Sequence, residues 1–235
     1  MNRIVLILGI CLTAAHAHDI ITTPITFDRE ISRILYDRCN SCHHPDGKAF
    51  SLMTYSDARP WAVAIKEEVL SRRMPPWGAV KGFGDFRNDK ALTPEQLEVI
   101  TSWVDGGVPE GEEKDFPPPP KFAEAQAIEH RHGDLVVSGE FQLTRPFTID
   151  GLALEKIPDK ASFQITAELP DGAVEPLLWI ENYKPQFAHP FLLRTPLELP
   201  KGAIIHGVPD GARVILQAPS PAPPAEATAH AGKPN

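Results

Sequence analysis

Residues 39–47 of the chain read CNSCHHPDG. Just before them, Ile31, Ile34 and Leu35 recur at three- and four-residue steps, the spacing that places side chains on one face of an α-helix. The sequence therefore predicts a helix over 27–38 that runs directly into Cys39.

The segment after this helix contains the pattern C-x-x-C-H, formed by Cys39, Cys42 and His43. The pattern is typical of a c-type haem attachment site. Two thiols at this spacing in a short turn can each form a thioether with one vinyl group of a haem, and the next imidazole then faces the iron. We therefore expect one covalent haem c at Cys39 and Cys42, with His43 as the proximal iron ligand.

Two other interpretations of the cysteine pair are less consistent with the sequence. A thioredoxin-like C-x-x-C requires a βαβ setting, whereas here a helix precedes the pair. A structural zinc site requires a second pair of ligands, and the sequence has no distant pair of suitable spacing to match Cys39 and Cys42.

A methionine is the expected ligand on the other side of the iron. Besides Met1, the chain contains Met53 and Met74. Met53 follows His43 too closely in the sequence to fold over a haem ring. Met74 precedes Pro75-Pro76, which stop a helix and hold the backbone extended. Met74 is therefore the predicted distal ligand, with an ordinary core methionine as the alternative. Histidine with methionine raises the reduction potential and fills both axial positions, which favours electron transfer.

Two further helices are expected before residue 110. The first covers about 57–72, with Pro60 in its first turn. The second begins at Thr93-Pro94-Glu95-Gln96, which supplies an N-cap, a proline at the first helical position and a capping-box partner. Gly106-Gly107 supplies its stop signal.

The composition changes after residue 110. Residues 111–125 are acidic and include the run Pro117–Pro120, which is expected to be extended and stiff. Beyond it, short apolar runs alternate with Pro, Gly, Asp and Asn, a pattern typical of an antiparallel sandwich. These runs are 135–137, 141–143, 162–166, 177–180, 191–193 and 214–216.

The first residues are typical of an export signal, with Arg3 before an apolar core and an A-x-A cleavage site at 15–17. The mature protein would be periplasmic or secreted, and Cys11 would be removed with the signal; a lipid anchor on Cys11 is disfavoured by the bulky Ile10. No later stretch has the length and apolarity of a membrane helix. The net charge of −8, without a basic cluster, argues against nucleic-acid binding and suits a basic or neutral redox partner.

Residues 27–109, with the segments CNSCHHPDG, SRRMPPW and LTPEQLEVITSWVDGGVPEG, resemble the small class-I-type cytochrome c domain of exported bacterial proteins. In many of those proteins this domain precedes a domain similar to copper type II ascorbate-dependent monooxygenases. The resemblance implies a three-helix haem fold with Met74 as distal ligand. It also implies that Trp61, Trp77 and Trp103 surround the haem, with ordinary core positions as the alternative.

Residues 191–216 resemble, more distantly, the closing strands of that monooxygenase's C-terminal sandwich. Copper chemistry there would need several histidines and a methionine, and the second half of the sequence has no methionine. The copper candidates in this region are His130, His132, His189 and His206. The first two have the spacing of a strand-like ligand pair, but surface histidines explain them equally well, so copper is not expected.

Together these patterns predict an α+β protein of two domains, a small all-α cytochrome c domain followed by an antiparallel β-sandwich. The expected ranges are a signal peptide over 1–17, the haem domain over 18–110, a linker over 111–125, the sandwich over 126–218 and a disordered tail over 219–235. The expected function is electron transfer by a carrier rather than an enzyme, with the sandwich docking a redox partner. Two alternatives stay open: a haem-coupled copper monooxygenase-like enzyme or its remnant, and a haem-based sensor with an open distal site.

Overall fold

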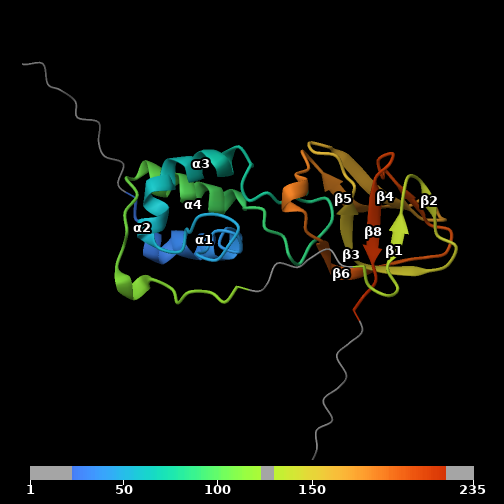
Figure 1. Cartoon of the computed structure of the whole chain (residues 1–235), viewed down its shortest axis with the longest axis horizontal. Coiled ribbons are helices and arrows are strands. Elements are labelled where there is room, and N and C mark those ends of the chain that lie inside the picture. Colours follow the sequence, from blue (N-terminus) through green and yellow to red (C-terminus); the bar gives the residue numbers. More distant parts are fainter. Residues whose placement is uncertain (1–22, 123–129, 221–235) are drawn as a thin grey trace, which may run out of the picture.

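The computed structural model describes residues 23–122 and 130–220 (Figure 1). The signal peptide expected over 1–17 lies outside the described residues, as does the expected tail from residue 221 onward. The helical elements are η1 (Phe27–Ile31), α1 (Ser32–Arg38), α2 (Tyr55–Ala58), η2 (Arg59–Trp61), α3 (Ala62–Leu70), α4 (Pro94–Asp105), η3 (Glu113–Asp115) and η4 (Pro185–Phe187). The strands are β1 (Leu135–Val137), β2 (Phe141–Gln142), β3 (Phe147–Glu155), β4 (Phe163–Glu168), β5 (Val174–Ile180), β6 (Phe191–Leu199), β7 (Ile204–His206) and β8 (Arg213–Gln217). No helix in these ranges is long and apolar enough to cross a membrane.

The capping signals in the sequence place the helix starts. The backbone N–H of Gln96 donates to Thr93 Oγ1 (3.2 Å), and the N–H of Thr93 donates to Gln96 Oε1 (3.0 Å), which confirms the predicted capping box of α4. The helix expected over 57–72 is instead three successive elements, α2, η2 and α3. Pro60 lies in the 3₁₀ turn η2, where a residue without an N–H is tolerated.

The strands form two antiparallel four-stranded sheets with the orders β1-β8-β3-β6 and β2-β7-β4-β5. Buried residues from both sheets belong to one hydrophobic cluster, so the sheets pack face to face as a sandwich (Figure 1). The largest fully buried side chains of the two sheets are Ile149, Leu152 and Phe191 from one and Ile165, Leu177, Leu178 and Ile180 from the other.

The loop between α3 and α4 covers an open side of this sandwich. We call residues 74–91 the bridging loop. β5 and β6 are edge strands of the two sheets, and the loop forms an isolated antiparallel bridge with each of them, Ala79 to Ile180 and Phe86 to Leu193. An edge strand has unpaired backbone groups; here the loop binds part of both edges.

The predicted fold class is wrong. The helices do not form a separate all-α domain, because the loop that connects α3 to α4 places Trp77, Ala79 and Phe86 in the core of the sandwich. The α-helices are also short, at seven, four, nine and twelve residues, and the fold is mostly β. The physical reason is that two packed sheets leave apolar residues accessible between their edges, and the bridging loop buries them.

Candidate haem attachment site

The C-x-x-C-H motif forms a tight turn at the end of α1. Cys39 is the C-cap residue of this helix, and its N–H still donates to the carbonyl of Leu35 (2.9 Å). The N–H groups of Cys42 and His43 both donate to the carbonyl of Cys39 (3.1 Å each). Both cysteines are free thiols rather than a disulfide. The turn therefore presents two thiols and one imidazole from a single rigid helix end.

The residues after the motif fold back beneath it. The N–H of Ala49 donates to the carbonyl of Cys42, and the N–H of Leu52 donates to the carbonyl of His43 (3.1 Å each). A Cβ atom at Gly47 would lie 2.3 Å from the Cys42 carbonyl oxygen, so only glycine fits at this close approach. The glycine of the quoted segment is thus a structural requirement of the turn.

His43 is held in one orientation by the backbone. Its Nδ1 lies 2.9 Å from the carbonyl oxygen of Phe50. A carbonyl only accepts hydrogen bonds, so Nδ1 carries the proton and Nε2 carries the free lone pair. Among residues 23–122 and 130–220, none makes a hydrogen bond to Nε2 of His43. Any residue can supply such a carbonyl, so the sequence carries no signal for the role of Phe50.

Burial raises the pKa of the Cys39 thiol from its ordinary 9.0 to about 12, with smaller contributions from the charge of Asp37 and from Cys42. Cys39 is therefore a neutral thiol at physiological pH. A neutral thiol is less prone to oxidation than a thiolate.

An exposed apolar surface adjoins His43. The ring of His43 packs edge-on against Phe50 (centroids 5.0 Å), and Phe50 packs against Trp61 (centroids 4.6 Å). Despite these contacts, Phe50 is 50 % exposed and Trp61 is 46 % exposed. Of the six large hydrophobic side chains exposed in the described ranges, four lie between residues 50 and 70. They are Phe50, Trp61, Val63 and Leu70.

Helix α3 contributes to this surface because it is apolar on two sides. Ala62 and Val69 are buried on its inner side, whereas Val63 and Leu70, seven residues apart, lie on one exposed face. A surface helix normally has one apolar face and one polar face. Phe50 and Trp61 next to His43 are the kind of exposed apolar side chains that a large flat apolar group would bury.

The two candidate methionines have different environments. Met53 Sδ accepts a hydrogen bond from Nδ2 of the fully buried Asn40 (3.1 Å), and the Met53 carbonyl accepts from Tyr36 (3.1 Å). Met74 is partly buried at the start of the bridging loop, and its N–H donates to the carbonyl of Glu68 (3.2 Å). The sulfur of Met53 thus already accepts a hydrogen bond from Asn40.

The three tryptophans expected around a haem lie in three different places. Trp61 is exposed against Phe50. Trp103 is fully buried among the helices, with Nε1 donating to the carbonyl of Pro109 (3.0 Å). Trp77 lies in the sandwich core. The structure therefore places Trp61 against Phe50, which contacts His43, and Trp103 in the helical cluster against which Cys39 packs, whereas Trp77 belongs to the other cluster.

The four copper candidates are each held separately. His130 Nε2 lies 2.7 Å from a carboxylate oxygen of Glu155, and His206 lies between two other glutamates at 3.2 and 3.3 Å. His189 donates from Nδ1 to the carbonyl of Phe187 (2.9 Å), and His132 is exposed. No group of three or more His, Cys, Asp or Glu side chains within the described ranges is arranged to hold a metal ion.

Comparisons of the chain with models of known protein families, with curated proteins and with solved structures found no match. The resemblance to exported bacterial cytochrome c domains therefore stays a prediction.

Proposed function

We propose that this protein is an exported mono-haem c-type cytochrome that transfers electrons. Cys39 and Cys42 attach the haem, His43 is the proximal ligand and Met74 is the distal ligand. The observation that carries the proposal is the hydrogen bond between His43 Nδ1 and the Phe50 carbonyl oxygen (2.9 Å). A backbone carbonyl that fixes the Nδ1 proton, and so leaves Nε2 as the donor atom, is a common arrangement for a metal-ligating histidine.

The neighbouring residues fit an iron porphyrin. Two free thiols lie one residue and four residues before His43. Phe50 and Trp61 offer apolar area that a bound ring would remove from water, at roughly 25 cal/mol per Å². A bound haem supplies reversible one-electron chemistry. The apolar side chains around it would limit solvent access, which tunes the reduction potential.

Met74 determines which kind of haem protein this is. A thioether on the distal side leaves the iron no open position for a substrate, so the protein would pass electrons without binding a reactant. Met74 is the better candidate for this role, because the Met53 sulfur is already hydrogen-bonded to Asn40. An open distal site would instead favour a sensor.

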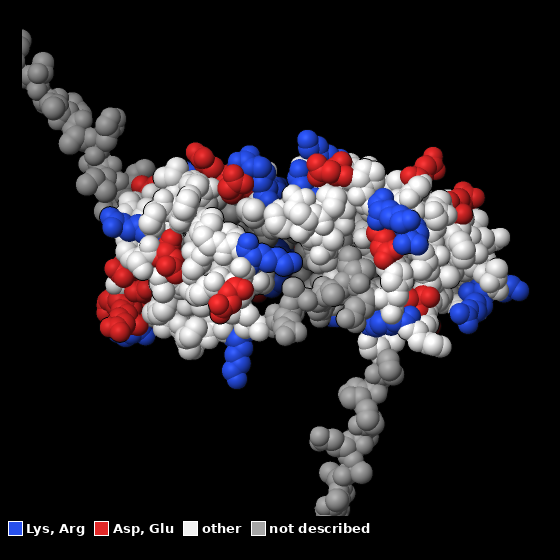
Figure 2. All heavy atoms as spheres, in the orientation of Figure 1, with Lys and Arg blue, Asp and Glu red and all other residues white. Residues whose placement is uncertain are grey.

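The charge distribution supports a basic redox partner. Figure 2 shows acidic side chains gathered at the end of the helical part that points away from the sandwich. Burial raises the pKa of the Asp28 carboxyl group, and the nearby carboxylates of Glu110, Asp115 and Glu113 raise it further. A cluster of carboxylates attracts a partner of opposite charge and speeds its association at low ionic strength.

The test is the oxidised and reduced absorption spectrum of protein exported in a host with cytochrome c maturation. We expect haem that stays attached after denaturation, and a methionine-to-iron charge-transfer band that disappears in Met74→Ala. Cys39→Ser/Cys42→Ser is the control that should lose covalent haem. If the wild-type protein carries no covalent haem, the proposal is wrong. If haem is covalent and the spectrum of Met74→Ala is unchanged, Met74 is not the ligand and the electron-transfer assignment fails.

A further inference from the structure

The bridging loop starts at the proposed distal ligand and enters the sandwich core within three residues. Trp77 is only 5 % exposed. Its ring stacks on His189 (centroids 4.8 Å, planes 30° apart) and meets Phe191 edge-on (5.1 Å). Both of these partners belong to the sandwich side of the chain, so the tryptophan nearest to Met74 is held by the sandwich and not by the helices.

The backbone around Trp77 is also held by the sandwich. The N–H of Glu181 donates to the carbonyl of Gly78 (2.9 Å), and the N–H of Val80 donates to the carbonyl of Trp179 in β5 (2.8 Å). Only Pro75 and Pro76 separate Met74 from Trp77, and proline rings fix the φ angle of their backbone. Met74 is thus joined to a fixed point in the sandwich by a short, stiff link.

The other end of the loop is anchored to both parts of the protein. On the sandwich side, Asn88 Nδ2 donates to the carbonyl of Pro190 (2.8 Å), and Asn88 Oδ1 accepts from the N–H of Leu192 (3.0 Å). On the helical side, Arg38, the residue directly before Cys39, donates from Nη1 to the carbonyl of Asp89 (2.6 Å).

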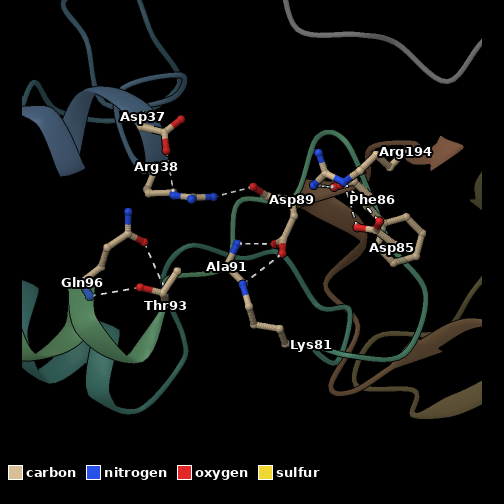
Figure 3. A network of polar contacts seen from close by, with 10 residues as sticks. All are labelled: Asp37, Arg38, Lys81, Asp85, Phe86, Asp89, Ala91, Thr93, Gln96 and Arg194. Carbon is tan, nitrogen blue, oxygen red and sulfur yellow. Dashed lines mark hydrogen bonds and ion pairs between the residues drawn. The ribbon is translucent and has the colours of Figure 1, made fainter.

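Figure 3 shows polar contacts on both sides of the loop. On the helical side, Arg38 at the end of α1 contacts Asp89, which also pairs with Lys81; separately, Asp85 of the loop pairs with Arg194 on β6. The carboxylate of Asp89 also joins two other residues of the loop: it accepts a hydrogen bond from the N–H of Ala91 (2.7 Å) and forms an ion pair with Lys81 (3.3 Å). The bridging loop is therefore hydrogen-bonded to the end of α1 on one side and to the sandwich on the other.

We propose that the β-sandwich sets the distal side of the haem site, with Trp77 as the positioning residue for Met74. This inference rests on the proposed function, because it takes Met74 as an iron ligand. The sandwich is then part of the redox site. When Trp77 is fixed between His189 and Phe191, the stiff link holds the Met74 sulfur at one distance from the haem-attachment turn; when Trp77 is lost, the sulfur is no longer held there.

The experiment compares Trp77→Ala and Trp77→Phe with wild type in the haem-loaded full chain. We expect Trp77→Ala to weaken the methionine-to-iron charge-transfer band and to raise the apparent affinity of the reduced protein for carbon monoxide by roughly tenfold or more, because the fraction of protein with an open distal position rises. Trp77→Phe should recover most of the band, since phenylalanine can still pack between His189 and Phe191.

Leu143→Ala is the matched control. Leu143 is buried in the same core next to β2, at the edge opposite to β5, so its truncation weakens the sandwich without touching the loop. We expect its band and carbon monoxide affinity to match wild type. If Trp77→Ala does not accumulate as folded protein, Asn88→Ala is measured instead. This variant removes two hydrogen bonds that anchor the loop without opening a large cavity, and we expect a smaller change of the band and of the carbon monoxide affinity in the same direction.

The outcomes separate the two proposals. Absence of covalent haem in wild type, or a band that survives Met74→Ala, refutes the proposed function and this inference with it. Covalent haem with a Met74-dependent band that is unchanged in folded Trp77→Ala or Asn88→Ala refutes the positioning role alone. Equal effects of Trp77→Ala and Leu143→Ala also overturn it, because general weakening of the sandwich would then explain both.

Discussion

The indole ring of Trp77 stacks on the imidazole ring of His189, with centroids 4.8 Å apart. Trp77 comes from the loop between α3 and α4, and His189 lies between η4 and β6. The contact joins two segments that sequence patterns assign to different domains. One hydrophobic core therefore includes side chains from both, and the stability of the sandwich depends on the loop.

Phe86→Ala tests this dependence. Phe86 is buried between Trp77 (centroids 6.0 Å) and Phe191 (5.7 Å). Truncation of a buried phenylalanine lowers the free energy of unfolding by about 3–5 kcal/mol, and denaturant titration followed by circular dichroism measures it. Phe83→Ala, which removes a partly buried ring from the same loop, is the control and should cost clearly less. Equal, small costs for both variants would contradict a shared core.

The stability of the sandwich should fall on mild acidification because of His189. Burial lowers the pKa of this histidine from its ordinary 6.5, and the hydrogen bond to Phe187 opposes this shift only in part. The unfolded chain therefore binds a proton at a higher pH than the folded chain does, so stability is lost as the pH falls below about 6.5. Unfolding titrations at pH values between about 7 and 5 measure the slope.

His189→Leu is the comparison for this prediction. Leucine fills a similar volume against Trp77 and cannot bind a proton. The decline of the unfolding free energy with acidification should be shallower in the variant than in wild type. The same slope in both proteins would show that other groups carry the pH dependence.

The ion pair between Arg87 and Asp150 links the loop to the central strand β3. It is bidentate, with nitrogen-to-oxygen distances of 3.0 and 2.8 Å, and the side chains are 41 % and 12 % exposed. A double-mutant cycle with Arg87→Met and Asp150→Asn should give a coupling free energy of about 1 kcal/mol, reduced by added salt. The well-exposed pair Arg194–Asp85 is the control and should give a smaller coupling. A larger value for the control would be inconsistent with burial as the cause.

Met53→Leu should mainly lower stability, whereas Met74→Leu should mainly abolish the methionine-to-iron band. Met53→Leu leaves the Nδ2 group of the buried Asn40 without its sulfur acceptor, which costs about 1–3 kcal/mol of stability, and it should keep the methionine-to-iron band. Met74→Leu should lose the band at a lower cost in stability, because Met74 is only partly buried. Thermal unfolding and absorption spectra of both haem-loaded variants measure the two effects. Loss of the band in Met53→Leu would reassign the ligand.

The sequence-based prediction of strands missed β3 and β7. Six consecutive residues of β3, from Ile149 to Leu154, are buried, but Asp150 and Gly151 interrupt the apolar run in the sequence. The pairing register shifts between Ile149 and Gly151, and a Cβ atom at Gly151 would lie 2.9 Å from Gln217 Oε1 and 3.0 Å from a Leu192 methyl. An isolated glycine in a strand often indicates such an irregularity. Gly151 in the sequence therefore indicated the irregularity in β3.

The sequence alone determined the local features of this protein. The capping box at Thr93 and Gln96 depends on hydrogen bonds between residues three apart, and the C-x-x-C-H turn depends on the end of one helix, so neighbouring residues are sufficient to predict them. The orientation of His43 and the packing of the bridging loop were decided only by the tertiary structure. The orientation of His43 depends on a backbone carbonyl, a group that every residue has. The packing of the bridging loop depends on contacts between residues more than a hundred positions apart, Trp77 with His189 and Phe86 with Leu193. Contacts at such separations leave no periodic pattern in the sequence, because they arise from burying apolar area between sheets whose edges form only when the whole chain has folded.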